Sequence, residues 1–174
     1  TTASSRWLGP AQLTALGFLA LILAGAALLS LPFASADGTA TPPMDALFTA
    51  TSATTLTGLV TVDTGSHWSL AGQVIVIALI QVGGLGIMSI TSLTGMLLTG
   101  RVKLRARYST AAEGRPILKG GVRRTLVATL LLTLAFEVLV AVILAVRFAT
   151  NYGMAPLRAA WEGVFHAISA FNNA

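Results

Sequence analysis

The chain has 174 residues, of which 55% are hydrophobic and only 10% are charged, whereas a typical soluble domain has about 25% charged residues. Together with a mean hydropathy of +0.80, this composition excludes an intrinsically disordered chain and favours a protein whose solvent is lipid. The absence of cysteine excludes a disulfide framework and a thiolate metal site. The two histidines, His67 and His166, are too far apart in the sequence to form a local metal motif.

The first apolar run covers residues 11–31 and is 21 residues long, which predicts one membrane-spanning helix. Pro32 should end this helix because proline has no N–H to donate. A cleaved signal peptide is the alternative, since Arg6 precedes the run and residues 34–36 read Ala-Ser-Ala. The run is longer than the apolar core of a signal peptide, about 7–15 residues, and this favours the span.

A second apolar segment, residues 42–53, is too short to cross a bilayer. Its two prolines and Asp45 are typical of a helix start. The following residues, 54–59, are rich in β-branched side chains and include Gly58, which predicts extended backbone. A short helix followed by extended backbone describes a re-entrant loop, and such backbone is tolerated at membrane depth only inside protein or along a water-filled path.

The next uncharged run predicts a helix over residues 70–99, which is 30 residues or about 45 Å long. That length exceeds the hydrocarbon core of about 30 Å, so the helix must tilt, bend or project from the membrane. Gly83, Gly84 and Gly86 lie in its middle. A phosphate-binding loop is the alternative for this cluster, but no strand precedes it, so close approach of a neighbouring backbone is favoured.

Positive charge is concentrated in one segment, residues 101–124, which holds eight of the eleven basic residues. A basic segment can bind nucleic acid, but its position between two apolar runs predicts a cytoplasmic loop and no nucleic-acid partner. The loop either contacts anionic lipid headgroups, docks a soluble subunit, or acts as a topology signal alone. The residues are Arg101, Lys103, Arg105, Arg107, Arg115, Lys119, Arg123 and Arg124.

The third apolar run, residues 125–146, is interrupted only by Glu137. An acid inside a span is costly, so Glu137 should face protein or water rather than lipid. The charge pattern predicts a multi-pass protein of the plasma membrane, with a cytoplasmic N-terminus and with residues 32–69 and 148–174 outside.

The last segment, residues 156–174, is again too short to span and again begins at a proline. An offset of 117 residues aligns FTATSATTLT (48–57) with FHAISAFNNA (165–174), with four identities in ten positions. Asp45 then falls on Glu162. The sequence therefore predicts a repeated unit of span, short pore helix, extended segment and span.

Two re-entrant helices that enter from one face suggest a pore. Backbone carbonyls in a selectivity filter replace the hydration shell of a monovalent cation, and the uncharged segment up to Gly58 suits that role. The negative end of each short helix would favour a cation at the pore centre. Asp45 and Glu162 either concentrate cations at the mouth or stabilise the helix starts.

Three stretches of the sequence resemble the KtrB/TrkH-type superfamily of potassium-uptake subunits, and the KtrB type more closely. The stretches read FTATSATTLTGLVTVDTGSHWSLAGQ, IQVGGLGIM and FHAISAFNNA. The resemblance implies four non-identical repeats in one polypeptide, each giving one glycine and its neighbouring carbonyls to a potassium filter. By this resemblance one quarter of the filter is formed by Thr55, Leu56, Thr57 and Gly58, and the second quarter includes Asn172, Asn173 and Ala174.

The resemblance further implies potassium as substrate and the only metal bound, no cofactor, and a membrane homodimer on a cytoplasmic ring of nucleotide-binding regulatory subunits of KtrA/TrkA type. Family members are about two to three times as long as this chain, so we expect an N-terminal portion of a longer protein. The expected organisation is an all-α membrane protein with one complete repeat (1–100), the basic loop (101–124) and the start of a second, incomplete repeat (125–174).

Two other function classes are alternatives to a potassium-conducting subunit. An enzyme is disfavoured, because no histidine, serine or acid has the spacing of a nucleophile elbow or a zinc-binding helix. A structural or assembly protein of the membrane is the remaining alternative, and the duplicated re-entrant segments argue against it.

Overall fold

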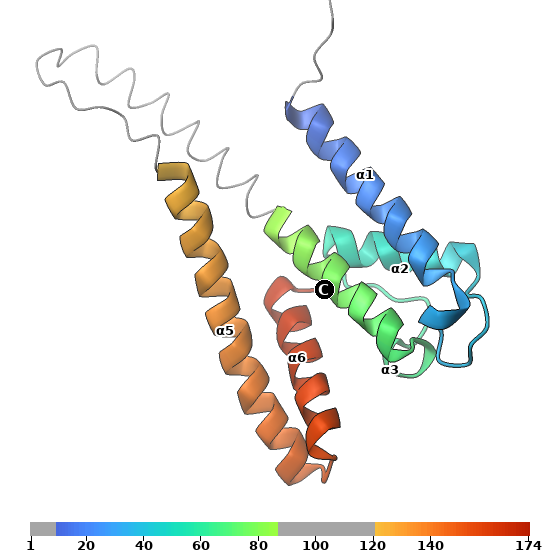
Figure 1. Ribbon diagram of the computed structural model, residues 1–174, viewed down its shortest axis with the longest axis vertical. Helices are drawn as coiled ribbons and strands as arrows, with labels where there is room; N and C mark the ends of the chain where they lie inside the picture. Colours follow the sequence, from blue (N-terminus) through green and yellow to red (C-terminus); the bar gives the residue numbers. More distant parts are fainter. Residues whose placement is uncertain (1–9, 87–120) are drawn as a thin grey trace, which may run out of the picture. The chain divides into compact units, whose positions relative to one another are not determined.

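A computed structural model describes residues 10–86 and 121–174. Over these residues the regular structure is helical, apart from one isolated antiparallel bridge between Ser35 and Trp68. The expected all-α class is therefore confirmed for the described part of the chain (Figure 1). The chain divides into two compact units, Thr1–Gly83 with Asn172–Ala174, and Gly84–Phe171.

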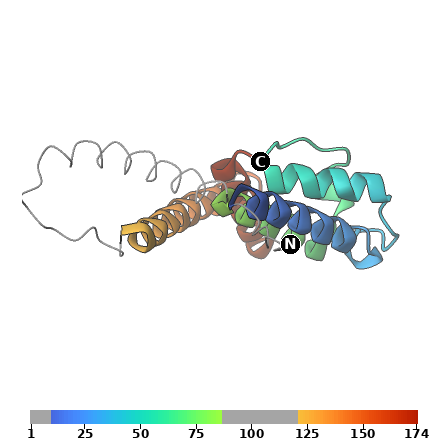
Figure 2. The ribbon, with the colours of Figure 1, turned by 90° about the horizontal axis from the view of Figure 1, so that it is seen from above.

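The first unit is built around three helices, of which α1 and α2 pack side by side (Figure 1, Figure 2). A one-turn 3-10 helix, η1, and the short α3 lie in the connections. The bounds are α1 Pro10–Leu29, η1 Pro32–Ala34, α2 Pro43–Thr55, α3 Thr64–His67, and a further helix described over Leu70–Gly86.

The predicted helix over residues 11–31 is confirmed, although it ends at Leu29. The N–H of Ser30 still bonds to the carbonyl of Ala26, but the N–H of Leu31 bonds three residues back, to Leu28. The last turn thus tightens before Pro32 begins η1, because proline cannot continue the donor series.

Small residues lie at helix contacts in the core of the first unit. A Cβ on Gly25 of α1 would lie 2.7 Å from the Leu79 side chain and 3.3 Å from that of Ala50. Leu29, Ala46 and Ala50 are completely buried. A glycine or alanine at each contact lets helix backbones approach closely, as is typical of helices packed in a membrane.

Two connections are tied together at one end of the first unit. The N–H of Ala36 donates to the His67 carbonyl at 2.8 Å, and the N–H of Ser69 donates to the Ala34 carbonyl at 2.9 Å. The Ser69 hydroxyl donates to the Phe33 carbonyl at 2.6 Å. These bonds satisfy backbone groups that no helix pairs, so the connection after α1 is fixed on the start of the helix at Leu70.

The second unit contains α5 (Gly121–Asn151) and most of α6 (Pro156–Asn172). The helices predicted over 125–146 and from Pro156 onward are thereby confirmed. Buried residues recur every four positions on both helices, which places them on one face of each. On α5 they are Thr133, Glu137 and Ala141, and on α6 they are Ala159, Gly163 and Ala167.

Glu137 is only 5% exposed and lies on the same face of α5 as Ala141. The prediction that it faces protein or water rather than lipid is therefore confirmed. On the opposite side of the helix, Leu139 is apolar and 56% exposed. The acid is thus placed in the packed face, where an ionisable group in a membrane helix is usually found.

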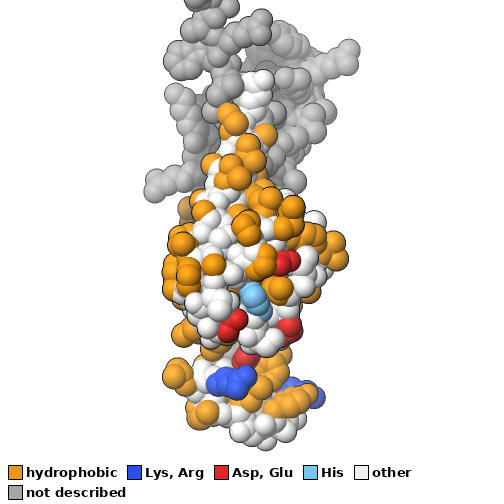
Figure 3. Space-filling model, turned by 90° about the vertical axis from the view of Figure 1, so that its right-hand side faces the viewer, with side chains coloured by type: hydrophobic (Ala, Val, Ile, Leu, Met, Phe, Trp, Pro, Cys, Tyr) orange, Lys and Arg blue, Asp and Glu red, His pale blue; other side chains and the backbone are white. Residues whose placement is uncertain are grey.

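Among the described residues, Val127–Asn151 is the one helix that is long and apolar enough to cross a membrane. Two further helical segments of the described part are apolar but shorter, Thr14–Leu29 and Leu70–Gly86. On the face drawn in Figure 3 hydrophobic side chains are widespread and charged ones are few. Exposed leucines on α1 include Leu16, Leu19 and Leu23.

Candidate functional site

The end of α2 differs from the sequence prediction of extended backbone over residues 54–59. Thr54 and Thr55 are helical, and Leu56 adopts the left-handed conformation with φ 59° and ψ 36°. The N–H groups of Leu56 and Thr57 both donate to the Ser52 carbonyl, which is the arrangement of a helix C-cap. The prediction was wrong for these three residues, and the irregular backbone begins at Thr57.

Two of the threonines, Thr51 and Thr55, fit this helix because their hydroxyls bond back to the preceding turn. The Thr51 hydroxyl donates to the Leu47 carbonyl at 2.7 Å, and the Thr55 hydroxyl donates to the Thr51 carbonyl at 2.8 Å. Each bond satisfies a polar side chain without leaving the helix. The β-branched composition of this segment therefore does not force it to extend.

Gly58 is exposed and has a φ of +70°. Glycine adopts this positive φ readily because it has no Cβ. A Cβ on Gly58 would lie 3.4 Å from the carbonyl carbon of Ala174 and 3.7 Å from the carbonyl oxygen of Asn173. Both of these residues belong to the same compact unit as Gly58. The structure thus brings together the two segments that the sequence analysis assigned to ion binding.

The backbone conformations of these two segments correspond at the offset of 117 residues. Leu56 and Asn173 have φ values of 59° and 58°, and they are the two non-glycine residues with positive φ in the described part of the chain. Each directly follows the last residue of its helix, Thr55 in α2 and Asn172 in α6. A left-handed residue is a common end of a helix and asparagine adopts it readily, but positive φ is rare for a leucine, so the conformation of Leu56 is the less expected of the two.

One glycine of the predicted cluster lies against the end of α2. A Cβ on Gly83 would overlap with the Thr54 carbonyl oxygen and would lie 2.9 Å from the carbonyl carbon. This confirms, for Gly83, the expectation of a close backbone approach. Two residues earlier, the Gln81 side-chain oxygen accepts a hydrogen bond from Nδ2 of Asn172 at 3.3 Å. Gln81 is a site residue that was not predicted from the sequence, although a polar residue inside an apolar run was the available signal.

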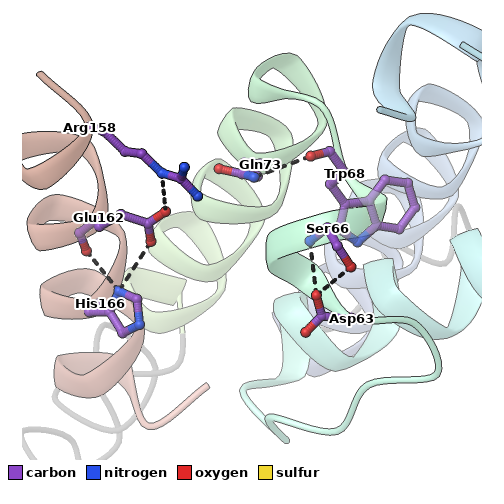
Figure 4. Close-up of polar contacts among 7 residues, drawn as sticks. All are labelled: Asp63, Ser66, Trp68, Gln73, Arg158, Glu162 and His166. Carbon is purple, nitrogen blue, oxygen red and sulfur yellow. Dashed lines mark hydrogen bonds and ion pairs between the residues drawn. The ribbon is translucent and has the colours of Figure 1, made fainter. Parts of the chain in front are cut away.

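The two acids of the short helices occupy different positions. Asp45 lies in the first turn of α2, so a helix-start role fits it. Glu162 lies beyond the first turn of α6, where it is 3.9 Å from Arg158 and 3.7 Å from the His166 ring (Figure 4). The helix-start role considered for Glu162 therefore does not hold, because α6 begins earlier than its counterpart in the alignment.

Two exposed acids in the connections of the first unit are held by local donors. The Ser35 hydroxyl, then the backbone N–H and hydroxyl of Thr39, lower the pKa of Asp37 to about 2. The hydroxyl and N–H of Ser66 likewise lower the pKa of Asp63 (Figure 4). Both carboxylates therefore stay ionised at neutral pH and place negative charge at the end of the unit where the two connections meet.

Only residues 121–124 of the basic segment lie within the described part of the chain. Six of its eight basic residues lie outside the described residues, and the other two, Arg123 and Arg124, fall at the start of α5. The predicted cytoplasmic loop thus remains a prediction.

The chemistry available at Gly58 is that of backbone oxygens. Carbonyl groups of the last turn of a helix have no intrahelical donor, and the negative end of the macrodipole is located there. In this structure two such helix ends, α2 and α6, lead into Thr57–Gly58 and Asn173–Ala174, which lie against each other. Neutral oxygens of this kind suit a weakly hydrated monovalent cation.

Residues 13–174 match the family of cation transport proteins named TrkH. The chain therefore belongs to this family, which is a class of membrane transporters rather than of enzymes, and its location is a membrane.

Among its relatives, the chain is 41% identical over 169 residues to the Ktr system potassium uptake protein B of Bacillus subtilis, covering 95% of this chain and 36% of that protein. It is 40% identical over 167 residues to the potassium/sodium uptake protein NtpJ of Enterococcus hirae, covering 96% of this chain and 37% of that protein. Ktr protein B of Vibrio alginolyticus is 36% identical over 171 residues, which cover 95% of this chain and 36% of that protein. The chain thus spans about a third of the length of these curated relatives.

Proposed function

We propose that this chain is the N-terminal portion of a potassium-conducting membrane subunit, which passes monovalent cations through a filter of backbone carbonyls. The observation that carries the proposal is the contact between Gly58 and the Asn173–Ala174 backbone. Each segment follows a helix that ends in a left-handed residue. The potassium uptake activity named for two relatives, the Ktr proteins B of Bacillus subtilis and Vibrio alginolyticus, supports potassium as the substrate.

In this proposal the chain supplies two of the quarters from which the filter is assembled. The carbonyls of Thr55, Leu56 and Thr57, with Gly58, form the first quarter, and Asn172–Ala174 lead into the second. The matched φ values of Leu56 and Asn173 support a repeat of pore helix and filter segment. The organisation into a complete repeat (1–100), a basic loop (101–124) and the start of a second repeat (125–174) is part of the same proposal.

Thermal unfolding of the full-length protein in detergent tests the proposed substrate. A ligand that binds only the folded state at a hundred times its Kd adds about 2.7 kcal/mol of stability. We expect potassium to raise the midpoint of unfolding and a bulky organic cation at equal ionic strength to leave it unchanged. Equal responses to both cations would support the alternative, a structural or assembly protein without a cation site.

The proposed topology has a cytoplasmic N-terminus and several spans, with the 101–124 segment in the cytoplasm. It is supported by the eight basic residues of that segment. Because the chain has no cysteine, a single Ser109→Cys variant reports the location of the segment. We expect an impermeant thiol reagent to label it only after the cells are opened, and labelling of intact cells from outside would reverse the topology.

The proposed partners are membrane lipid, a regulatory ring and a second copy of the subunit. The basic segment offers charge for anionic lipid headgroups and for a cytoplasmic regulatory ring of nucleotide-binding subunits of KtrA/TrkA type, and the subunit works as a homodimer. The designation of the two proteins B as components of a Ktr system supports a multi-subunit assembly.

A further inference from the structure

One short stretch of the helix Leu70–Gly86 contacts one proposed filter segment at Asn172 and, at Thr54, the residue that directly precedes the other. Gly83 lies against the Thr54 backbone at the end of α2. Gln81 accepts the hydrogen bond from Asn172, the residue that precedes Asn173 and Ala174. All of these residues belong to the first compact unit.

The contact at Gly83 leaves no room for a side chain. A Cβ there would overlap with the Thr54 carbonyl oxygen and would lie 3.1 Å from the Thr54 Cα. Thr54 is completely buried, and only Thr55 separates it from Leu56, whose left-handed conformation turns the chain toward Gly58. A larger residue at position 83 would therefore displace the start of the first filter segment, because backbone atoms cannot rotate aside as a side chain does.

The contact at Gln81 joins residues that are 91 positions apart in the sequence. Asn172 is only 6% exposed, and a typical hydrogen bond within a protein contributes about 0.5–1.5 kcal/mol to stability. The bond therefore specifies where the Asn172–Ala174 segment lies relative to the helix that also supports Thr54. Gln81 and Gly83 are separated only by Val82, which is 52% exposed.

We propose that Gln81 and Gly83 are positioning residues, which fix the spacing between the Thr55–Gly58 segment and the Asn172–Ala174 segment and so determine cation selectivity. This inference rests on the proposed function. Selectivity in a carbonyl filter depends on the size of the cage or on the number and field of its carbonyl groups. Both change when one segment shifts relative to the other, so loss of either contact should affect discrimination before it affects transport.

The ratio of potassium to sodium uptake by cells that express the full-length protein tests this inference. We expect Gln81→Ala to lower the ratio about fivefold, the change that corresponds to one hydrogen bond, with membrane abundance within about twofold of wild type. Gly83→Ala should lower the ratio as well. The matched control is Val82→Ala, an exposed position between the two, which should leave ratio and abundance unchanged.

An exchange of the two amides separates positioning from general stability. Gln81→Asn shortens the pair by one methylene and Asn172→Gln lengthens it, so each single variant should lower the ratio. The double variant restores the combined length and should return the ratio to within about twofold of wild type. These conservative variants also test the positioning role if Gln81→Ala does not reach the membrane.

An unchanged ratio in the single variants, or a ratio that the exchange does not restore, overturns the inference. A loss of abundance with an unchanged ratio in the remaining protein also overturns it, because it would show a merely structural role. The proposed function is judged separately by Gly58→Ser. If Gly58→Ser changes the ratio and the Gln81 variants do not, the proposed filter is retained and only the positioning role of Gln81 and Gly83 is rejected.

Discussion

Replacing Gly58 by serine should lower the ratio of potassium to sodium uptake about tenfold while leaving the protein folded. A side chain on a residue with positive φ costs about 1–3 kcal/mol, and 1.4 kcal/mol corresponds to a factor of ten. The nearest atom to the new Cβ would be the Ala174 carbonyl carbon at 3.4 Å, an ordinary contact. The effect therefore comes from the backbone angle of +70° rather than from a collision, and the carbonyls beside Gly58 rotate.

Gly38 provides a matched control for this experiment. Its φ is +72°, nearly the same as that of Gly58, and a Cβ there would meet nothing within 4 Å. Gly38→Ser thus introduces the same backbone strain far along the chain from the filter segment, and we expect no change in the uptake ratio. Gly58→Asp should stop uptake, since it adds a charge beside the proposed ion path. An unchanged ratio in Gly58→Ser would place the filter elsewhere.

Helix starts were predictable because their signals are local. Pro43 and Asp45 mark the beginning of α2, and Pro156 marks that of α6. A proline at the first turn has a φ suited to the helix and loses no hydrogen bond there. These features need no knowledge of the tertiary structure, so the sequence was sufficient for the existence and the start of both short helices.

The end of α2 was not predictable in the same way. Threonine-rich sequence favours extended backbone on average, but the hydroxyls of Thr51 and Thr55 bond within the helix. The buried position of Thr54 against Gly83 adds a tertiary contact that favours the helical form. The boundary thus depends on the packing of a helix about thirty residues further along, which no local pattern reports.

The pairing of Gln81 with Asn172 is the other feature that the sequence does not reveal. Its two residues lie 91 positions apart, and the glycine cluster beside Gln81 predicted close packing without naming the partner. In contrast, the offset of 117 residues was visible in the sequence, because a repeated unit keeps small residues at the same helix positions. Ala50 and Ala167 correspond at that offset and are 0% and 1% exposed.

Replacing Gly163 by leucine should destabilise the pairing of α5 and α6 strongly. A Cβ at this position would lie 2.6 Å from the Ala141 carbonyl oxygen and 2.9 Å from the Ala145 backbone nitrogen. Both are backbone atoms of α5, so the two helices must separate to admit the side chain. We expect the free energy of unfolding to fall by about 3 kcal/mol, at the upper end of the range for overpacking.

The matched control is Ala160→Leu, an exposed position on the same helix, which should change the free energy of unfolding by no more than about 0.5 kcal/mol. Thermal unfolding of the two full-length variants in the same detergent compares them directly. Equal midpoints would show that the face of α6 at Gly163 does not pack on α5. We expect a large loss of stability in Gly163→Leu alone, because helices in a membrane associate through close van der Waals contact of small residues. Apolar surface gains little free energy by leaving lipid.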